Sequence, residues 1–125
     1  MTKVFLSLIL LTQVCYGQNF ISVDDAFLPQ SGNGISIVDF NNDNFKDVLI
    51  CGNNTNGVRV CNSYLNNGDF DFELIEGNSI SGVVGDYDFA DVDNDGDQDL
   101  FVIGQNNLFV RIAELYLNDG NGIFY

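Results

Sequence analysis

The sequence matches itself when it is shifted by 52 residues, the separation of Asp39 from Asp91. Under this shift an acidic loop, an apolar run, a Val-Arg pair and a Tyr-Leu-Asn string superpose without a gap. Phenylalanine also recurs at this interval, at Phe20, Phe72 and Phe124. A fixed internal period of this length indicates a repeat architecture, in which each unit buries its apolar face against the next.

Each period contains four short strand patterns separated by turns, and no helical periodicity competes with them. One of them is a continuous apolar run, as in a strand covered on both faces. The strands predicted for the first complete unit are about Ile35 to Asp39, Val48 to Cys51, Val58 to Leu65 and Phe70 to Ile75. We therefore predict an all-β fold of four-stranded antiparallel units, the plan of a β-propeller blade.

The phase of the repeat predicts how the blades divide the chain. We expect an orphan outer strand within residues 18–30, one blade over residues 31–77 and a partial blade over residues 78–125. Phe20 to Val23 matches the last strand of a blade, and the three strands that should precede it are missing upstream. Because propellers close with roughly four to eight blades, we expect an incomplete propeller, the N-terminal part of a longer protein.

An acidic loop follows the first predicted strand of each unit. In the second unit Asp91, Asp93, Asp95 and Asp99 occupy loop positions 1, 3, 5 and 9, and Gly96 at position 6 permits a tight turn. Five carboxylates within these nine residues repel one another unless a hard divalent cation lies among them. The spacing therefore predicts a calcium site, with an Asx-rich turn that holds no metal as the alternative.

The first loop has the same pattern with fewer carboxylates. Its residues at loop positions 1, 3, 5 and 9 are Asp39, Asn41, Asp43 and Asp47. Asn41 offers a neutral amide oxygen in place of a carboxylate, and Asn44 stands where the second loop has glycine. Asparagine tolerates a left-handed backbone better than most residues, so the turn is retained. Because it has fewer carboxylates, we expect the first site to bind calcium less tightly.

Residues 1–17 have the pattern of a secretory signal peptide. Lys3 supplies a positive start, Val4 to Leu11 is an apolar run too short to span a bilayer, and Cys15 and Gly17 place small residues before the expected cleavage point. A buried N-terminal strand or helix is the alternative. We expect a secreted or cell-surface protein, with no membrane insertion once the signal is removed.

The charge balance limits the partners that the chain can bind. The sequence has 18 acidic residues against 4 lysines and arginines, a net charge of −14, which argues against nucleic acid and anionic membranes. It has no histidine, and we find no nucleophile elbow and no glycine-rich phosphate loop, so we do not expect an enzyme. Arg59 and Arg111 share one repeat position and are expected to pair with nearby carboxylates.

Two cysteines, Cys51 and Cys61, flank a predicted hairpin turn. A cross-strand disulfide fits an exported protein, whereas two small buried thiols fit the apolar Ile103 and Ala113 that occupy the same positions in the next repeat. Both interpretations stay open at this point.

The string GDYDFADVDNDGDQDLFVIG over residues 85–104, followed by YLNDGNGIF from Tyr116, resembles the FG-GAP/VCBS repeat family. This family includes the propellers of integrin α-chains and of many secreted bacterial surface proteins. The resemblance implies a propeller with calcium in the loops between the first two strands of its blades. It also implies that the backbone carbonyls of Phe45 and Asp97 join the two ligand sets. The loops do not fit an EF-hand, which needs a glutamate at loop position 12. That position is Ile50 in the first loop and Val102 in the second.

We expect two structural calcium ions, the second loop holding the stronger site. The function that follows is a calcium-binding secreted or cell-surface module for adhesion or for interaction with an extracellular protein or glycan. The alternative is the noncatalytic propeller part of a larger secreted hydrolase or lyase.

Overall fold

The structure is a computed structural model, and it describes residue 27, residues 30–69 and residues 71–125. The signal peptide expected over residues 1–17 and the strand expected over Phe20 to Val23 lie outside these described residues. The described part contains seven strands. Within it, no helix has the length and apolarity needed to cross a membrane.

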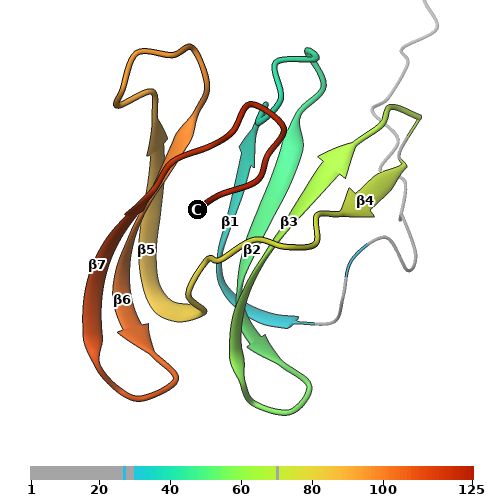
Figure 1. Cartoon of the computed structure of the whole chain (residues 1–125). Helices are drawn as coiled ribbons and strands as arrows, with labels where there is room; N and C mark the ends of the chain where they lie inside the picture. Colours follow the sequence, from blue (N-terminus) through green and yellow to red (C-terminus); the bar gives the residue numbers. More distant parts are fainter. Residues whose placement is uncertain (1–26, 28–29, 70) are drawn as a thin grey trace, which may run out of the picture.

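The first sheet contains four antiparallel strands in the order β1-β2-β3-β4 (Figure 1). Their bounds are β1 Gln30–Val38, β2 Asp47–Asn54, β3 Arg59–Asn66 and β4 Phe72–Leu74. β1 begins five residues before the predicted Ile35, because its ladder with β2 continues past an irregularity between Gly32 and Gly34. The four strands predicted for one period are all present.

The second sheet repeats the first three of these strands. They are β5 Val83–Ala90, β6 Asp99–Asn106 and β7 Arg111–Tyr116, in the order β5-β6-β7. After β7 the chain turns back, and Phe124 bridges to Asn118 as Phe72 pairs with Asn66 in the first sheet. The 52-residue shift that superposes the sequence of one repeat on the next therefore also superposes the pairing of their strands.

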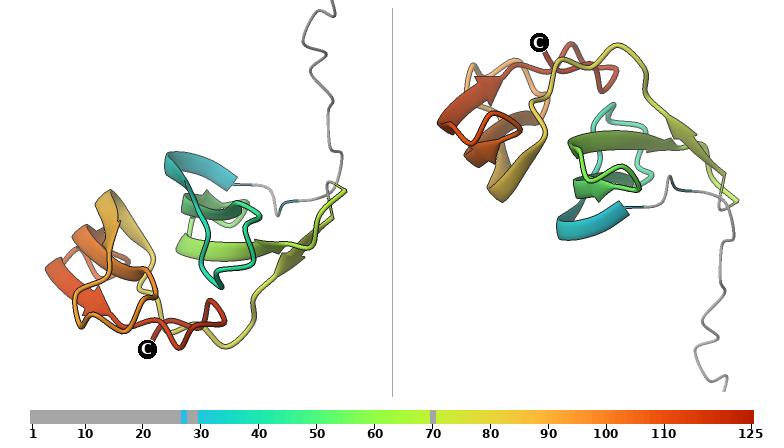
Figure 2. Two further views of the ribbon diagram at one scale, coloured as in Figure 1. Left: turned by 90° about the horizontal axis from the view of Figure 1, so that it is seen from above. Right: turned by 90° about the horizontal axis from the view of Figure 1, so that it is seen from below.

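The two sheets face one another and enclose the core (Figure 2). Leu49 and Cys51 of β2 contribute to the same buried cluster as Leu100 and Val102 of β6. The other buried members of this cluster are Phe40, Val83, Tyr116 and Phe124. Side chains alternate between the two faces of a strand, so the inward residues of β6 leave its other residues pointing away from the first sheet.

Aromatic rings join the sheets at one end of this core. Phe40 lies two residues after the end of β1, Phe89 is in β5 and Phe124 follows β7. The ring centroids are 5.5 Å apart for Phe40 and Phe89 and 5.4 Å apart for Phe40 and Phe124. Such edge-to-face and tilted pairs add to the stabilisation that burial provides.

At the opposite end, Arg59 joins the first sheet to the β6–β7 hairpin. Its guanidinium donates hydrogen bonds to the carbonyl oxygens of Gln105, at 2.9 Å, and of Asn106. It also lies over the ring of Phe109, with 5.1 Å between the guanidinium carbon and the ring centroid. Among the described residues Arg59 therefore pairs with carbonyl oxygens and an aromatic ring, and not with the carboxylate that we predicted.

Cys51 and Cys61 form a disulfide between directly opposed residues of β2 and β3. Ile103 and Ala113 are opposed in the same way in the second sheet. Of the two interpretations of the cysteines, the structure supports the cross-strand disulfide.

Both acidic loops lie at one end of the sheets, and the two tight hairpins lie at the other (Figure 1). The all-β prediction is confirmed. The sheets do not close on one another, and they form consecutive blades of an incomplete β-propeller.

Candidate metal centre

Each acidic loop connects the first two strands of its sheet, and left-handed backbone closes it at loop positions 4 and 6. Asparagine and glycine are the residues that adopt this conformation most readily. The φ angles are 60° at Asn42, 74° at Asn44, 63° at Asn94 and 101° at Gly96. The expectation that Asn44 takes the place of glycine is confirmed.

The aspartate at loop position 9 anchors each loop to its sheet. In the second loop Asp99 is buried and accepts hydrogen bonds from the N–H groups of Val92 and Asn118, both at 2.9 Å. The equivalent Asp47 accepts from the N–H groups of Phe40 and Asn66, at 2.6 and 2.9 Å. This carboxylate therefore joins the start of the loop to the end of the third strand or the residues just after it.

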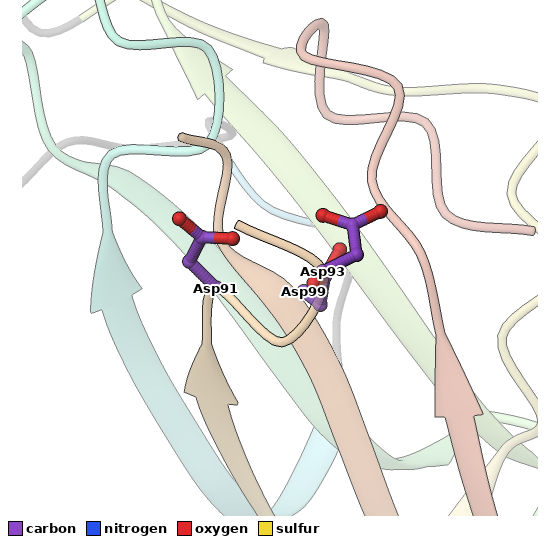
Figure 3. A group of neighbouring side chains, drawn as sticks. All are labelled: Asp91, Asp93 and Asp99. Atoms are coloured by element: carbon purple, nitrogen blue, oxygen red, sulfur yellow. The ribbon is translucent and has the colours of Figure 1, made fainter. Parts of the chain in front are cut away.

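Three carboxylates of the second loop converge around its turn (Figure 3). One oxygen from each of Asp91, Asp93 and Asp99 lies within 4.8 Å of the others. Asp91 Oδ2 accepts from the N–H of Gly96 at 3.1 Å. Asp91 Oδ1 is buried, and no donor within the described part of the chain reaches it. A buried acceptor without a donor is costly unless something supplies positive charge to it.

Asp95 and Asp97 lie outside this group of three. Asp95 Oδ1 accepts from the N–H of Asp97 at 2.9 Å, which tightens the turn. The Asp97 carboxylate accepts from Asn42 Nδ2 of the first loop at 2.7 Å, so its side chain is directed towards the neighbouring blade. The sequence assigns Asp97 a role through its backbone carbonyl, and that assignment stays a prediction.

The first loop satisfies its own acceptors more completely. Both oxygens of Asp39 accept backbone N–H groups, those of Asp43 at 3.2 Å and Asn44 at 3.0 Å. Asn41 directs an amide N–H to Asp43 Oδ2 at 2.9 Å, and Asp43 Oδ1 accepts from the N–H of Phe45 at 2.7 Å. Among the described residues, the group of three converging acidic side chains occurs in the second loop and not in the first.

Electrostatics opposes full ionisation of these loops when no cation is bound. Burial raises the pKa of Asp47, and repulsion from Asp43 and Asp39 adds to the rise, against the hydrogen bonds from the backbone of Asn66 and Phe40. In the second loop, partial loss of water raises the pKa of Asp93, with further repulsion from Asp95 and Asp99. A bound cation would reverse this effect, because it favours the ionised carboxylates.

The sequence reasoning missed the structural role of one asparagine. Asn118 is buried, and its Nδ2 donates to the carbonyls of Phe40 at 2.8 Å and Gln98 at 3.1 Å. Its Oδ1 accepts from the N–H groups of Gly120 and Gly122, at 3.1 and 3.0 Å. Asn118 therefore links the second loop, the C-terminal turn and the neighbouring blade. The recurrence of the Tyr-Leu-Asn string after each third strand is the signal that points to this position.

One comparison with known proteins identifies the family of the chain. The family model described as an FG-GAP-like repeat matches residues 39–102, just over half of the 125 residues. A search of curated proteins and a search of solved structures each found no match. The matched region begins at the first acidic loop and includes the whole of the second, so the chain belongs to the FG-GAP-like repeat family.

Proposed function

We propose that this chain is a calcium-stabilised β-propeller module of a secreted or cell-surface protein. Its role is noncatalytic, and it supports adhesion or interaction with an extracellular protein or glycan. Two observations on one group carry the calcium part of the proposal: Asp91, Asp93 and Asp99 converge, and the buried Asp91 Oδ1 has no donor among the described residues.

The donor set fits calcium in its chemistry. Calcium takes oxygen ligands from carboxylates, amide side chains and backbone carbonyls, and it tolerates irregular geometry. In the second loop the ligands are the side chains of Asp91, Asp93, Asp95 and Asp99 and the carbonyl of Asp97. In the first loop they are the side chains of Asp39, Asn41, Asp43 and Asp47 and the carbonyl of Phe45.

Bound calcium neutralises the clustered acid and holds the ends of two strands together. Because the loops join β1 to β2 and β5 to β6, order in the loop is coupled to order in the blade. The free energy of binding then adds to the free energy of unfolding. The chain contributes ligands, the left-handed turns and the anchoring aspartates Asp47 and Asp99.

The second site is the stronger in this proposal. Asp93 supplies a carboxylate where the first loop has Asn41, and Asn41 already donates an N–H to Asp43. A cation in the first loop has to displace that hydrogen bond. It also gains less charge from the neutral amide.

A calcium titration of the full chain tests the proposal. Calcium at about 100 times its Kd stabilises a protein by about 2.7 kcal/mol, so the melting temperature should rise by roughly 10 °C or more. Asp95→Ala should remove most of this gain, because it deletes a ligand of the stronger site. Circular dichroism of thermal unfolding with and without calcium measures both. No shift at millimolar calcium would refute the calcium site.

Three further variants make the comparison between the loops direct. Asp93→Asn gives the second loop the first loop's residue, and Asn41→Asp does the reverse. The calorimetrically measured calcium affinity should fall in the former and rise in the latter. Glu73→Ala removes an exposed acid outside the loops and should leave the calcium response unchanged. A response that tracks total charge, equally in all three variants, would contradict specific ligation.

A further inference from the structure

The two acidic loops lie at the same end of the fold (Figure 1), and one side chain of the first loop contacts the second. Asn42, at loop position 4, donates from Nδ2 to the Asp97 carboxylate at 2.7 Å and to the Gly96 carbonyl at 3.4 Å. The N–H of Gly96 donates in turn to Asp91 Oδ2 at 3.1 Å, and Asp91 belongs to the group of three converging carboxylates. One amide of the first blade therefore holds the turn of the second loop.

A buried chain of hydrogen bonds joins the two loops at their bases. Asn118 donates its N–H to Asp99 Oδ1 at 2.9 Å and an Nδ2 hydrogen to the Phe40 carbonyl at 2.8 Å. The N–H of Phe40 then donates to Asp47 Oδ2 at 2.6 Å. All four residues are at most 2% exposed. Three hydrogen bonds thus connect the aspartate at position 9 of one loop to its equivalent in the other.

Both connections end at or beside the ligands proposed for calcium. Asp47 and Asp99 are members of the two ligand sets. Asn42 belongs to neither set, but its neighbours Asn41 and Asp43 are both ligands of the first loop. The contacts between the loops therefore form only when both loops hold their ordered shapes together.

We propose that the two calcium sites are coupled, so that filling either one raises the calcium affinity of the other. This inference rests on the proposed calcium function and adds to it. A loop that an ion has ordered offers fixed partners to the neighbouring loop, whose ordering then costs less conformational entropy. The coupling is reciprocal, because each site must change the affinity of the other by the same factor. Asn42 and Asn118 are the positioning residues, and neither is a ligand.

Repulsion between two bound cations acts against this coupling. A divalent ion leaves neither loop with a net positive charge, because the first loop has three carboxylates and Lys46 and the second has five carboxylates. Salt screens the remaining repulsion over about 8 Å at an ionic strength of about 0.15 M. The hydrogen bonds act at contact distance, and screening of buried groups is much weaker. At this ionic strength the contacts therefore set the sign of the coupling.

The chain itself supplies a matched control for Asn42. Asn94 occupies position 4 of the second loop, and its φ of 63° is close to the 60° of Asn42. Within the described part of the chain, the Asn94 side chain makes no hydrogen bond to the other loop. Glycine at either position keeps the left-handed backbone and removes only the side chain. Asn42→Gly therefore deletes a contact between the loops, and Asn94→Gly deletes an equivalent side chain without one.

Calorimetric titrations of the full chain with calcium, at about 0.15 M salt, measure the coupling. Asp95→Ala disables the second site and Asp43→Ala the first, so each variant gives one single-site association constant. The product of the two constants of the intact chain should exceed the product of these single-site constants about fivefold or more. Asn42→Gly in all three chains should at least halve this factor, and Asn94→Gly should leave it unchanged. Adding Asn118→Ala to Asn42→Gly removes the buried connection too and should abolish the coupling.

Hydrogen exchange gives a readout that a merely stabilising role of Asn42 would not change. In the Asp43→Ala chain only the second site binds calcium. Calcium should still slow the exchange of the Asn44 N–H, which donates to Asp39 Oδ2 in the first loop at 3.0 Å, by severalfold. Asn42→Gly in the same chain should reduce this slowing, and Asn94→Gly should not.

The outcomes of the titrations separate the coupling from calcium binding itself. Equal products for the intact chain and the single-site variants mean independent sites, which overturns the coupling and leaves calcium binding standing. A smaller product in the intact chain means that repulsion outweighs the contacts, and it overturns the coupling as well. Equal effects of Asn42→Gly and Asn94→Gly, or coupling that survives the loss of both Asn42 and Asn118, rule out these contacts as its path. An intact chain that binds no calcium refutes the sites and the coupling together.

Discussion

Asn118 shows how much of this fold depends on single amide side chains. It uses both Nδ2 hydrogens and its Oδ1 within the protein, and the groups that it contacts belong to three separate segments. Asn66, its equivalent in the first blade, donates only to the Lys46 carbonyl and accepts from the N–H of Gly68 in the contacts that the structure describes. The difference arises because Phe40 comes from a neighbouring blade, which only Asn118 reaches.

Asn118→Ala should therefore destabilise the chain by about 2–4 kcal/mol, since it leaves several buried backbone groups unpaired. Asn66→Ala, whose side-chain contacts are more exposed, should cost about 1 kcal/mol. Urea denaturation in the presence of a calcium chelator measures both without a contribution from metal. Equal costs for the two variants would show that the contact with Phe40 carries no stabilisation.

At the scale of elements, the β2–β3 and β6–β7 hairpins differ in the side chains that fill one pair of directly opposed positions. Cys51 and Cys61 fill the directly opposed positions with a covalent bond, and Ile103 and Ala113 fill them with aliphatic side chains. The disulfide closes a short loop and restricts the unfolded chain. The aliphatic pair contributes through side-chain packing alone, and Ile103 is exposed.

The disulfide should contribute about 2–3 kcal/mol, as expected for a loop of this length. Cys51→Ala with Cys61→Ala should lose this amount and part of the core packing as well. Cys51→Ile with Cys61→Ala transplants the pair from the second blade, and it should retain more stability because it refills the core. Urea unfolding midpoints of the three chains measure the difference. A wild-type midpoint that a reducing agent leaves unchanged would contradict a contribution from the bond.

At the scale of the whole molecule, the chain has a net charge of −14, and its two acidic loops lie at the same end of the fold (Figure 1). Self-repulsion of this kind opposes the compact state. Calcium, if it binds as proposed, relieves the repulsion where it is strongest. The stability of the chain should then depend on pH in opposite senses with and without the ion.

The direction in which stability changes with pH can be predicted for Asp47. Its pKa in the folded chain is raised above the ordinary value of 3.8, first by burial. Its contribution to the free energy of unfolding is therefore greatest below pH 3.8 and is lost as the pH rises through the folded pKa. Calcium needs the ionised carboxylate, so the stabilisation by calcium should grow over the same range.

Urea denaturation in a chelator, from below pH 3.8 to neutrality, compares the wild type with Asp47→Asn. The free energy of unfolding of the wild type should fall more steeply with pH, because the variant has no carboxyl group to ionise at this position. Other carboxylates act equally in both chains. Parallel profiles would show that Asp47 does not titrate differently on folding.

The sequence by itself determined the period, the strand content and the positions of both acidic loops. These properties are local: alternation and apolar runs specify strands, asparagine and glycine specify left-handed turns, and the 52-residue shift relates one blade to the next. The family was also recognisable, because its motif lies in consecutive residues. Even the tolerance of Asn44 at a glycine position followed from the properties of one residue type.

Only the tertiary structure decided which groups meet across the blades. The pairing of Asn118 with the Phe40 carbonyl and of Arg59 with the β6–β7 hairpin joins residues 78 and about 46 positions apart. No local pattern specifies such contacts, because they depend on how two sheets stack. For the same reason Arg59 binds carbonyls rather than the carboxylates that its charge suggested. The stacking of sheets also left Phe101 and Ile103 exposed, although their equivalents Leu49 and Cys51 are buried.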